Sequence, residues 1–153
     1  MQFVLQFQIK IDFMKKLSIL FLALAIISCK DLDVQKVSYT TTTMMGRTVM
    51  SVSPDSVIVT FNGRGEPTYF ARETKSSEWE GIMNSLKEVD LKKIADLLAP
   101  SNSRTTDAAP YAQFDVYTKD STFTSASFDG KNPNEVLMPL MEEILKIQDA
   151  NKY

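Results

Sequence analysis

The chain has 153 residues and a formal net charge of -2, with 17 basic and 19 acidic residues, no histidine and one cysteine. This mild acidity argues against a nucleic-acid partner, because nucleic-acid binding needs clustered Lys and Arg. The lack of histidine excludes Ser-His and Cys-His nucleophilic pairs, histidine general bases and histidine-ligated zinc. A carboxylate pair, a Ser-Lys dyad or a carboxylate metal site is still open, but none shows a recognisable spacing. We therefore expect no catalytic residues, no metal ligands and no bound cofactor.

A secretory signal is indicated near the N-terminus. Lys15 and Lys16 form a positive n-region, and residues 17–27 form an apolar stretch. These eleven residues suit the h-region of a signal peptide and are too few to span a bilayer. We interpret residues 1–28 as a cleaved signal peptide, with Met14 as an alternative start of translation, and exclude them from the fold prediction.

Cys29 ends the apolar stretch and follows Ile26, Ile27 and Ser28. This segment resembles the bacterial lipobox, in which the cysteine is acylated and becomes the mature N-terminus. The alternative is a buried free cysteine, which is a liability in an oxidising compartment. The resemblance implies a small bacterial lipoprotein with its lipid on Cys29, and several acyl chains on one residue anchor a protein stably in the membrane.

The mature chain then begins with a predicted lipidated tether, residues 29–36. Lys30, Asp31 and Asp33 are similar to the lysine-plus-acidic signal that directs some Gram-negative lipoproteins to the outer face of the outer membrane. A solvated linker is an equal alternative. We expect an outer-membrane lipoprotein of the cell envelope, with the periplasmic or surface leaflet undecided. Residues 37–153 suit one small domain with a single core.

The first half of this domain predicts strands. Residues 37–45 are rich in threonine, which favours extended structure, and residues 48–52 continue it. Residues 56–62 and 67–73 alternate apolar and polar side chains on either side of a glycine-rich turn at 63–65. We expect the last two segments to form a hairpin.

Two helical segments follow. Ser77 and Glu80 have the spacing of a capping box, which predicts that a helix starts at Ser77. Trp79 belongs to an apolar stripe with helical spacing and is interpreted as a core residue rather than a ligand platform. Asp90 is expected to cap a second, short helix over residues 91–98.

The polar segment 101–110 is the candidate binding loop. Arg104, Asp107 and Tyr111 are the candidate binding residues, because side chains in such a loop can bond a backbone or a partner. Asp107 is expected to accept backbone amides of the loop or to pair with Arg104. The alternative is a surface turn in which this aspartate caps its own backbone.

A second hairpin and a terminal helix complete the prediction. Residues 111–118 alternate in the manner of a strand with one buried face, and residues 122–128 run back. Residues 129–135 have enough oxygen atoms for calcium, but lysine and proline occupy ligand positions, so a turn is favoured. The last helix is expected to begin at Asn132, or at Pro139 because proline is costly inside a helix.

The predicted fold class is α+β, with an antiparallel sheet of hairpins packed on one face by two amphipathic helices after the N-terminal signal segment. The order of elements, with Asp107 before a strand and residues 128–130 followed by Pro133 and a leucine-rich helix, is similar to emfourin, a small inhibitor of thermolysin-type metalloproteases. The resemblance covers about residues 56–147. It implies an inhibitor-like domain, although no inhibitory segment can be matched residue by residue.

Two functions from different classes remain open. The first is a membrane-anchored, non-catalytic binding module with a protein partner in the cell envelope, and an inhibitor-like domain is one form of it. The alternative is a carboxylate-based hydrolase of the cell envelope, which would depend on Asp107, Asp115 or Asp129.

Overall fold

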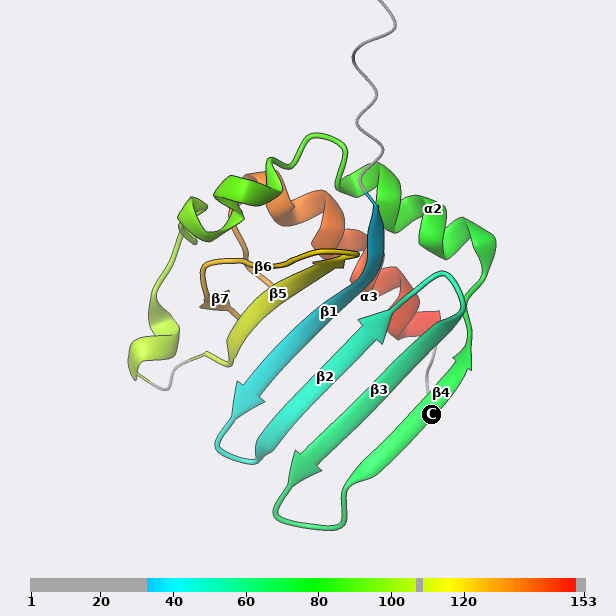
Figure 1. Ribbon diagram of the computed structural model, residues 1–153. Helices are drawn as coiled ribbons and strands as arrows, with labels where there is room; N and C mark the ends of the chain where they lie inside the picture. The colour runs from blue at the N-terminus through cyan, green and yellow to red at the C-terminus, as the bar shows by residue number, and fades with distance from the viewer. Residues whose placement is uncertain (1–32, 107–108, 151–153) are drawn as a thin grey trace, which may run out of the picture. The chain divides into compact units, whose positions relative to one another are not determined.

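An antiparallel sheet is the basis of the fold (Figure 1). The computed structural model describes residues 33–106 and 109–150. Within these ranges the sheet has seven strands in the order β4-β3-β2-β1-β5-β6, and β7 also pairs with β5. The strands are β1 (Val34–Thr43), β2 (Gly46–Val52), β3 (Ser56–Gly63), β4 (Thr68–Glu73), β5 (Tyr111–Thr118), β6 (Thr122–Thr124) and β7 (Phe128–Asp129).

Helices α2 (Ser76–Ser85) and α3 (Met138–Ala150) pack against each other, and α3 passes behind the sheet in the view of Figure 1. The connections in the described chain include the short 3-10 helices η1 (Leu91–Asp96), η2 (Ser103–Thr106) and η3 (Glu135–Leu137). The core comprises fully buried side chains from sheet and helices, among them Val37, Val52, Val57, Ile82, Leu86, Phe114, Leu140 and Ile144. The predicted α+β fold of hairpins and two amphipathic helices is therefore confirmed.

Successive side chains of a strand point to opposite faces, so the other face of the sheet carries a different set of residues. On β1 these are Ser38, Thr40 and Thr42, which alternate with the core residues. The hydroxyl oxygens of Ser38 and Ser51 lie 2.8 Å apart, and Asp115 is in register with Ser38. This face is consequently rich in hydroxyl groups.

The first strand begins earlier than the sequence predicted. Residues 34–36 were expected to belong to the tether, but Val34 is buried and β1 already pairs with β5 there. The register shifts between Val34 and Lys36, and Lys36 Nζ lies 3.9 Å from the centre of the Tyr117 ring. The bulge brings Val34 into the core just before the regular strand pairing begins. The polar residues around Val34 are why the sequence pattern did not predict a strand there.

The predicted capping box of α2 is wrong by two residues. Lys75 is the N-cap, and its amide donates to Glu78 Oε2 at 3.0 Å. The Arg72 guanidinium on β4 holds the same carboxylate through two hydrogen bonds of 2.8 Å each. Those bonds lower the pKa of Glu78, although burial opposes the shift. An ion pair with the preceding strand thus fixes where the helix starts.

The apolar stripe of α2 is only partly in the core. Ile82 and Leu86 are fully buried, whereas Trp79 is half-buried. The predicted cap at Asp90 is confirmed, since its carboxylate accepts from the Lys92 amide at 3.1 Å. The short helix that follows is 3-10, and it ends at Asp96.

The second hairpin is shorter than predicted. In β5 the inward residues Ala112, Phe114 and Val116 are fully buried, as expected. The returning strand β6 ends at Thr124. The Ser125 amide still donates to the Phe114 carbonyl at 2.9 Å, but the Phe114 amide donates to the Ser125 hydroxyl, at 3.0 Å, rather than to a backbone carbonyl. The chain then resumes pairing with β5 as β7.

The C-terminal helix does not begin at Asn132. Asn134 is the N-cap of η3, with its side chain accepting from the Val136 amide at 3.1 Å. The helix α3 then starts at Met138, next to the alternative start at Pro139, where the missing amide of proline costs no helical hydrogen bond.

The predicted signal peptide, Cys29, Lys30 and Asp31 lie outside the described residues, and Asp33 is the first residue that the structure describes. Among the residues that are described, no helix is long and apolar enough to cross a membrane.

Candidate binding site at one end of the sheet

The candidate binding loop is held by a buried ion pair. Arg104, in η2, places Nη1 3.0 Å from Oδ1 of Asp129 in β7, and the two side chains are 14% and 7% exposed. The carboxylate also accepts the backbone amides of Ser103 at 2.7 Å and Arg104 at 2.9 Å. The guanidinium donates further to Ser127 Oγ at 3.0 Å and to the Ser101 carbonyl at 2.8 Å. Both charged groups are therefore satisfied within the protein.

Asp129 is stabilised in its charged form. Burial alone would raise the pKa of this carboxyl, but hydrogen bonds from the Ser101 hydroxyl, from the Arg104 and Ser103 amides and from the Arg104 guanidinium outweigh it. The pKa of Asp129 is consequently held well below its usual range. This carboxylate acts as a fixed anion that organises the loop.

The anchoring role that the sequence assigned to Asp107 is filled by Asp129. Asp107 itself lies outside the described residues, so its contacts stay a prediction. The sequence placed Asp129 in a turn and named it as a carboxylate of the hydrolase alternative, and did not predict its contact with the loop. Its pairing with Arg104, 25 residues earlier in the chain, could not be deduced without the fold.

An aromatic cluster in the core contacts the segments next to the candidate binding loop. Phe114 and Phe128 are 5.2 Å apart between ring centroids, and Tyr39 is 5.5 Å from Phe114. The Tyr39 hydroxyl donates to the Gly130 carbonyl at 2.9 Å, and the Gly130 amide donates to the Pro110 carbonyl at 2.8 Å. Burial raises the pKa of Tyr39 to about 12. These contacts tie the segment before β5 to the central strand.

The tip of the β1–β2 hairpin lies beside this loop. Thr43 Oγ1 accepts from the Met45 amide at 3.1 Å, and Gly46 completes the turn with a φ of 151°. Met44 and Met45 are 80% and 64% exposed. The backbone of this tip is therefore defined, while its two thioether side chains reach into solvent.

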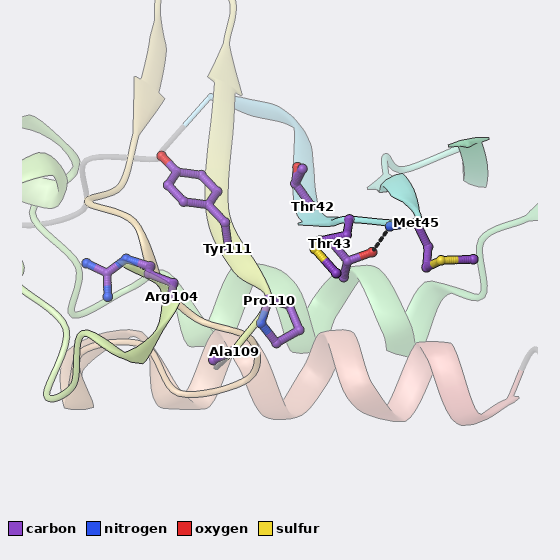
Figure 2. A pocket seen from close by; sticks show the side chains of 8 residues that line it. Thr42, Thr43, Met45, Arg104, Ala109, Pro110 and Tyr111 are labelled. Carbon is purple, nitrogen blue, oxygen red and sulfur yellow. Dashed lines mark hydrogen bonds between the residues drawn. The ribbon is translucent and has the colours of Figure 1, made fainter. Parts of the chain in front are cut away.

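A hollow of about 540 Å³ separates the tip from the loop (Figure 2). Tyr111, in register with Thr42 on β1, is 44% exposed at its edge. Of the three candidate binding residues, Arg104 and Tyr111 are thus brought together here. The lining residues are Thr42, Thr43, Met44, Met45, Arg104, Ala109, Pro110 and Tyr111. We refer to this set as the tip hollow.

A second hollow, of about 440 Å³, also involves Arg104. It adjoins the exposed Leu98, and its lining is Leu98, Ala99, Pro100, Ser101, Asn102, Arg104, Ala126 and Ser127. Arg104 therefore contributes to both hollows while its charge is neutralised by Asp129.

The tip hollow offers apolar and hydroxyl groups rather than reactive ones. Within residues 33–106 and 109–150, no three acidic or cysteine side chains are grouped as a metal site would require. Asp115 Oδ1 accepts from the Thr124 hydroxyl at 2.6 Å, and Asp129 is held by Arg104. Neither carboxylate lines the tip hollow or the second hollow.

The sequence missed the two methionines of the tip hollow. They were treated as the end of a threonine-rich strand, although the glycine that follows them is a turn signal. Comparisons of the chain with protein-family models, with curated proteins and with solved structures found no match. The resemblance to emfourin therefore stays a prediction.

Proposed function

We propose that this chain is a membrane-anchored lipoprotein of the outer membrane whose domain is a non-catalytic binding module for a protein partner in the cell envelope. The observation that supports the proposal is the exposure of Met44, Met45 and Tyr111 around one hollow beside a firmly held loop. Exposed apolar groups gathered in this way are typical of interaction surfaces. Methionine in particular adapts its shape to a partner.

The membrane part of the proposal depends on Cys29. Metabolic labelling with a fatty-acid probe in the bacterial host should mark the wild-type protein and leave Cys29→Ser unmarked. Equal labelling of the two proteins would contradict the lipid anchor. This measurement is independent of any binding partner.

The binding part is tested with the mature chain, immobilised and exposed to detergent-solubilised envelope. We expect a stoichiometric partner that is retained by the wild type and lost by Met44→Ser/Met45→Ser. Tyr69→Ser is the matched control, because Tyr69 is 69% exposed on β4, away from the tip hollow. Equal retention by the methionine variant and the wild type would contradict the proposed surface.

The emfourin resemblance supplies a first defined partner. A thermolysin-type metalloprotease should be inhibited by the wild type and less by Met44→Ser/Met45→Ser if the domain is inhibitor-like. The hydrolase alternative requires a different result, namely turnover of an envelope substrate that is abolished by Asp107→Asn, Asp115→Asn or Asp129→Asn while the methionine variant keeps it.

A further inference from the structure

The chain between the proposed lipid and the sheet is very short. Only residues 30–33 separate Cys29 from Val34, the first residue of β1. Five residue steps span at most about 18 Å when fully extended. Since Cys29 would carry the acyl chains, the start of β1 cannot lie far from the membrane surface.

The tip hollow lies at the other end of the same strand. β1 has 10 residues and therefore measures roughly 33 Å at about 3.3 Å per residue. Met44 and Met45 follow directly after its last residue. Figure 1 shows β1 running from the end where the chain enters the sheet to the β1–β2 turn at the opposite end.

The strand register places the rest of the site at this far end too. Val34 is in register with Thr118 of the antiparallel β5, whereas Thr42 is in register with Tyr111. The turn at 119–121 is therefore beside the start of β1, and Tyr111 is beside its end. Arg104, which also lines the tip hollow, belongs to the far end as well.

We propose that the domain stands on the membrane with the tip hollow at its membrane-distal end, so that its partner is a protein in the aqueous space and not lipid. This inference rests on the lipid anchor of the proposed function and adds the direction in which the site faces. The exposed methionines could otherwise be taken for a second membrane contact.

The open face of the sheet makes the opposite arrangement, with the domain lying flat, unfavourable. Thr42 on β1 and Gln113 and Asp115 on β5 are exposed or partly exposed on that face, and their hydroxyl, amide and carboxylate groups would lose water at a lipid surface without gaining apolar burial. Helices that lie flat on membranes present a strongly apolar face with basic residues beside it. The hydroxyl-rich face lacks that character along β1.

The orientation can be measured with single fluorescent labels. Acylation occupies the thiol of Cys29, the only cysteine in the sequence, so an introduced cysteine gives a unique attachment point. The probe positions are Met45→Cys at the tip, Asp120→Cys in the turn beside the start of β1, and Tyr69→Cys on the open face. Lipidated protein is purified from bacterial membranes and reconstituted into phosphatidylcholine vesicles with a nitroxide quencher on the lipid headgroup.

We expect the label at position 120 to lose most of its fluorescence and the label at position 45 to keep it. Strong quenching at positions 45 and 69 together would overturn the upright orientation in favour of a flat one. Strong quenching at position 45 alone would show that the tip contacts lipid. Protein that fails to float with the vesicles and lacks the lipid mass would instead overturn the anchor itself, and the proposed function with it.

Discussion

Arg104 and Asp129 are 25 residues apart in the chain, yet Nη1 and Oδ1 are 3.0 Å apart and both side chains are largely buried. The pair joins η2 to β7 and thereby places one wall of the tip hollow against the β1–β2 turn. Because the carboxylate also accepts two backbone amides, it fixes the loop backbone as well as the guanidinium. The geometry of the candidate site thus depends on one acidic residue that does not itself line the tip hollow.

Asp129→Asn is expected to lower the thermal unfolding midpoint at pH 7. An asparagine can accept fewer of the four hydrogen bonds and leaves the guanidinium of Arg104 without a counter-charge. Thermal denaturation followed by circular dichroism measures the effect. Asp115→Asn is the control, and it should shift the midpoint less, because the Asp115 carboxylate accepts from a single side chain of the described residues, the Thr124 hydroxyl. Equal midpoints for the two variants would contradict the role assigned to Asp129.

The stability that Asp129 contributes should depend on pH. Its pKa in the folded protein is held below the unfolded value of about 3.9, so the contribution is complete above that pH and is lost as the pH falls toward the folded pKa. The difference in unfolding free energy between the wild type and Asp129→Asn should therefore be constant from pH 7 to pH 5 and shrink below pH 4. Urea denaturation at a series of pH values measures it. A difference that grows on acidification would contradict the sign of the pKa shift.

Tyr39→Phe is expected to destabilise the domain by about 1 kcal/mol, because it leaves the Gly130 carbonyl without its buried donor. Urea denaturation is the measurement. Tyr117→Phe keeps an aromatic ring under Lys36 and should change stability less, which makes it a matched control. An unchanged free energy of unfolding in Tyr39→Phe would show that this hydrogen bond does not help to hold the loop.

Sequence patterns correctly predicted the structural elements that are determined by residues close together in the chain. The alternation of Ala112, Phe114 and Val116 reflects the two-residue period of a strand, and all three side chains are buried as expected. The cap at Asp90 also depends on a residue two positions away, and it is confirmed. In both cases the residues that determine the structure are within a few positions of each other in the sequence.

Features set by tertiary contacts could not be predicted in this way. The sequence predicted a capping box at Ser77 and Glu80, but α2 is capped at Lys75, where the Arg72 side chain on β4 and the Lys75 amide both bind the Glu78 carboxylate. The same holds for the candidate site, because Arg104 and Asp129 are far apart in the chain and lie in contact in a fold in which β7 pairs with β5. The sequence suggested Asp107 because it is close to Arg104 in the chain, and that contact stays a prediction; the contribution of the more distant Asp129 required the fold.

Gly46→Ala is expected to cost about 1–3 kcal/mol and to displace the methionine tip, because the backbone there has a positive φ of 151°. A Cβ atom at this position would also collide with the Asn62 carbonyl and lie 2.7 Å from the Gly63 Cα, neither of which can move freely. Gly65→Ala is the control, since nothing lies within 4 Å of its Cβ position. Gly46→Ala should lower both the stability to urea and the binding of a partner more than Gly65→Ala does. Equal effects of the two variants would show that the backbone at Gly46 does not require glycine.

Gly81→Ala is expected to be neutral or stabilising, although an added Cβ would lie 2.6 Å from Oε2 of Glu143. That oxygen is the far end of a flexible side chain, which can turn away from α2 and give up its exposed contact with Lys146. Replacing glycine by alanine inside a helix contributes roughly 0.5–1 kcal/mol of stability. The full gain should therefore emerge when Gly81→Ala is introduced into Glu143→Ala, where no side chain has to move. A double-mutant cycle by urea denaturation measures the coupling. Destabilisation by Gly81→Ala in both backgrounds would contradict this prediction, because the three atoms nearest the Cβ position all belong to the Glu143 side chain.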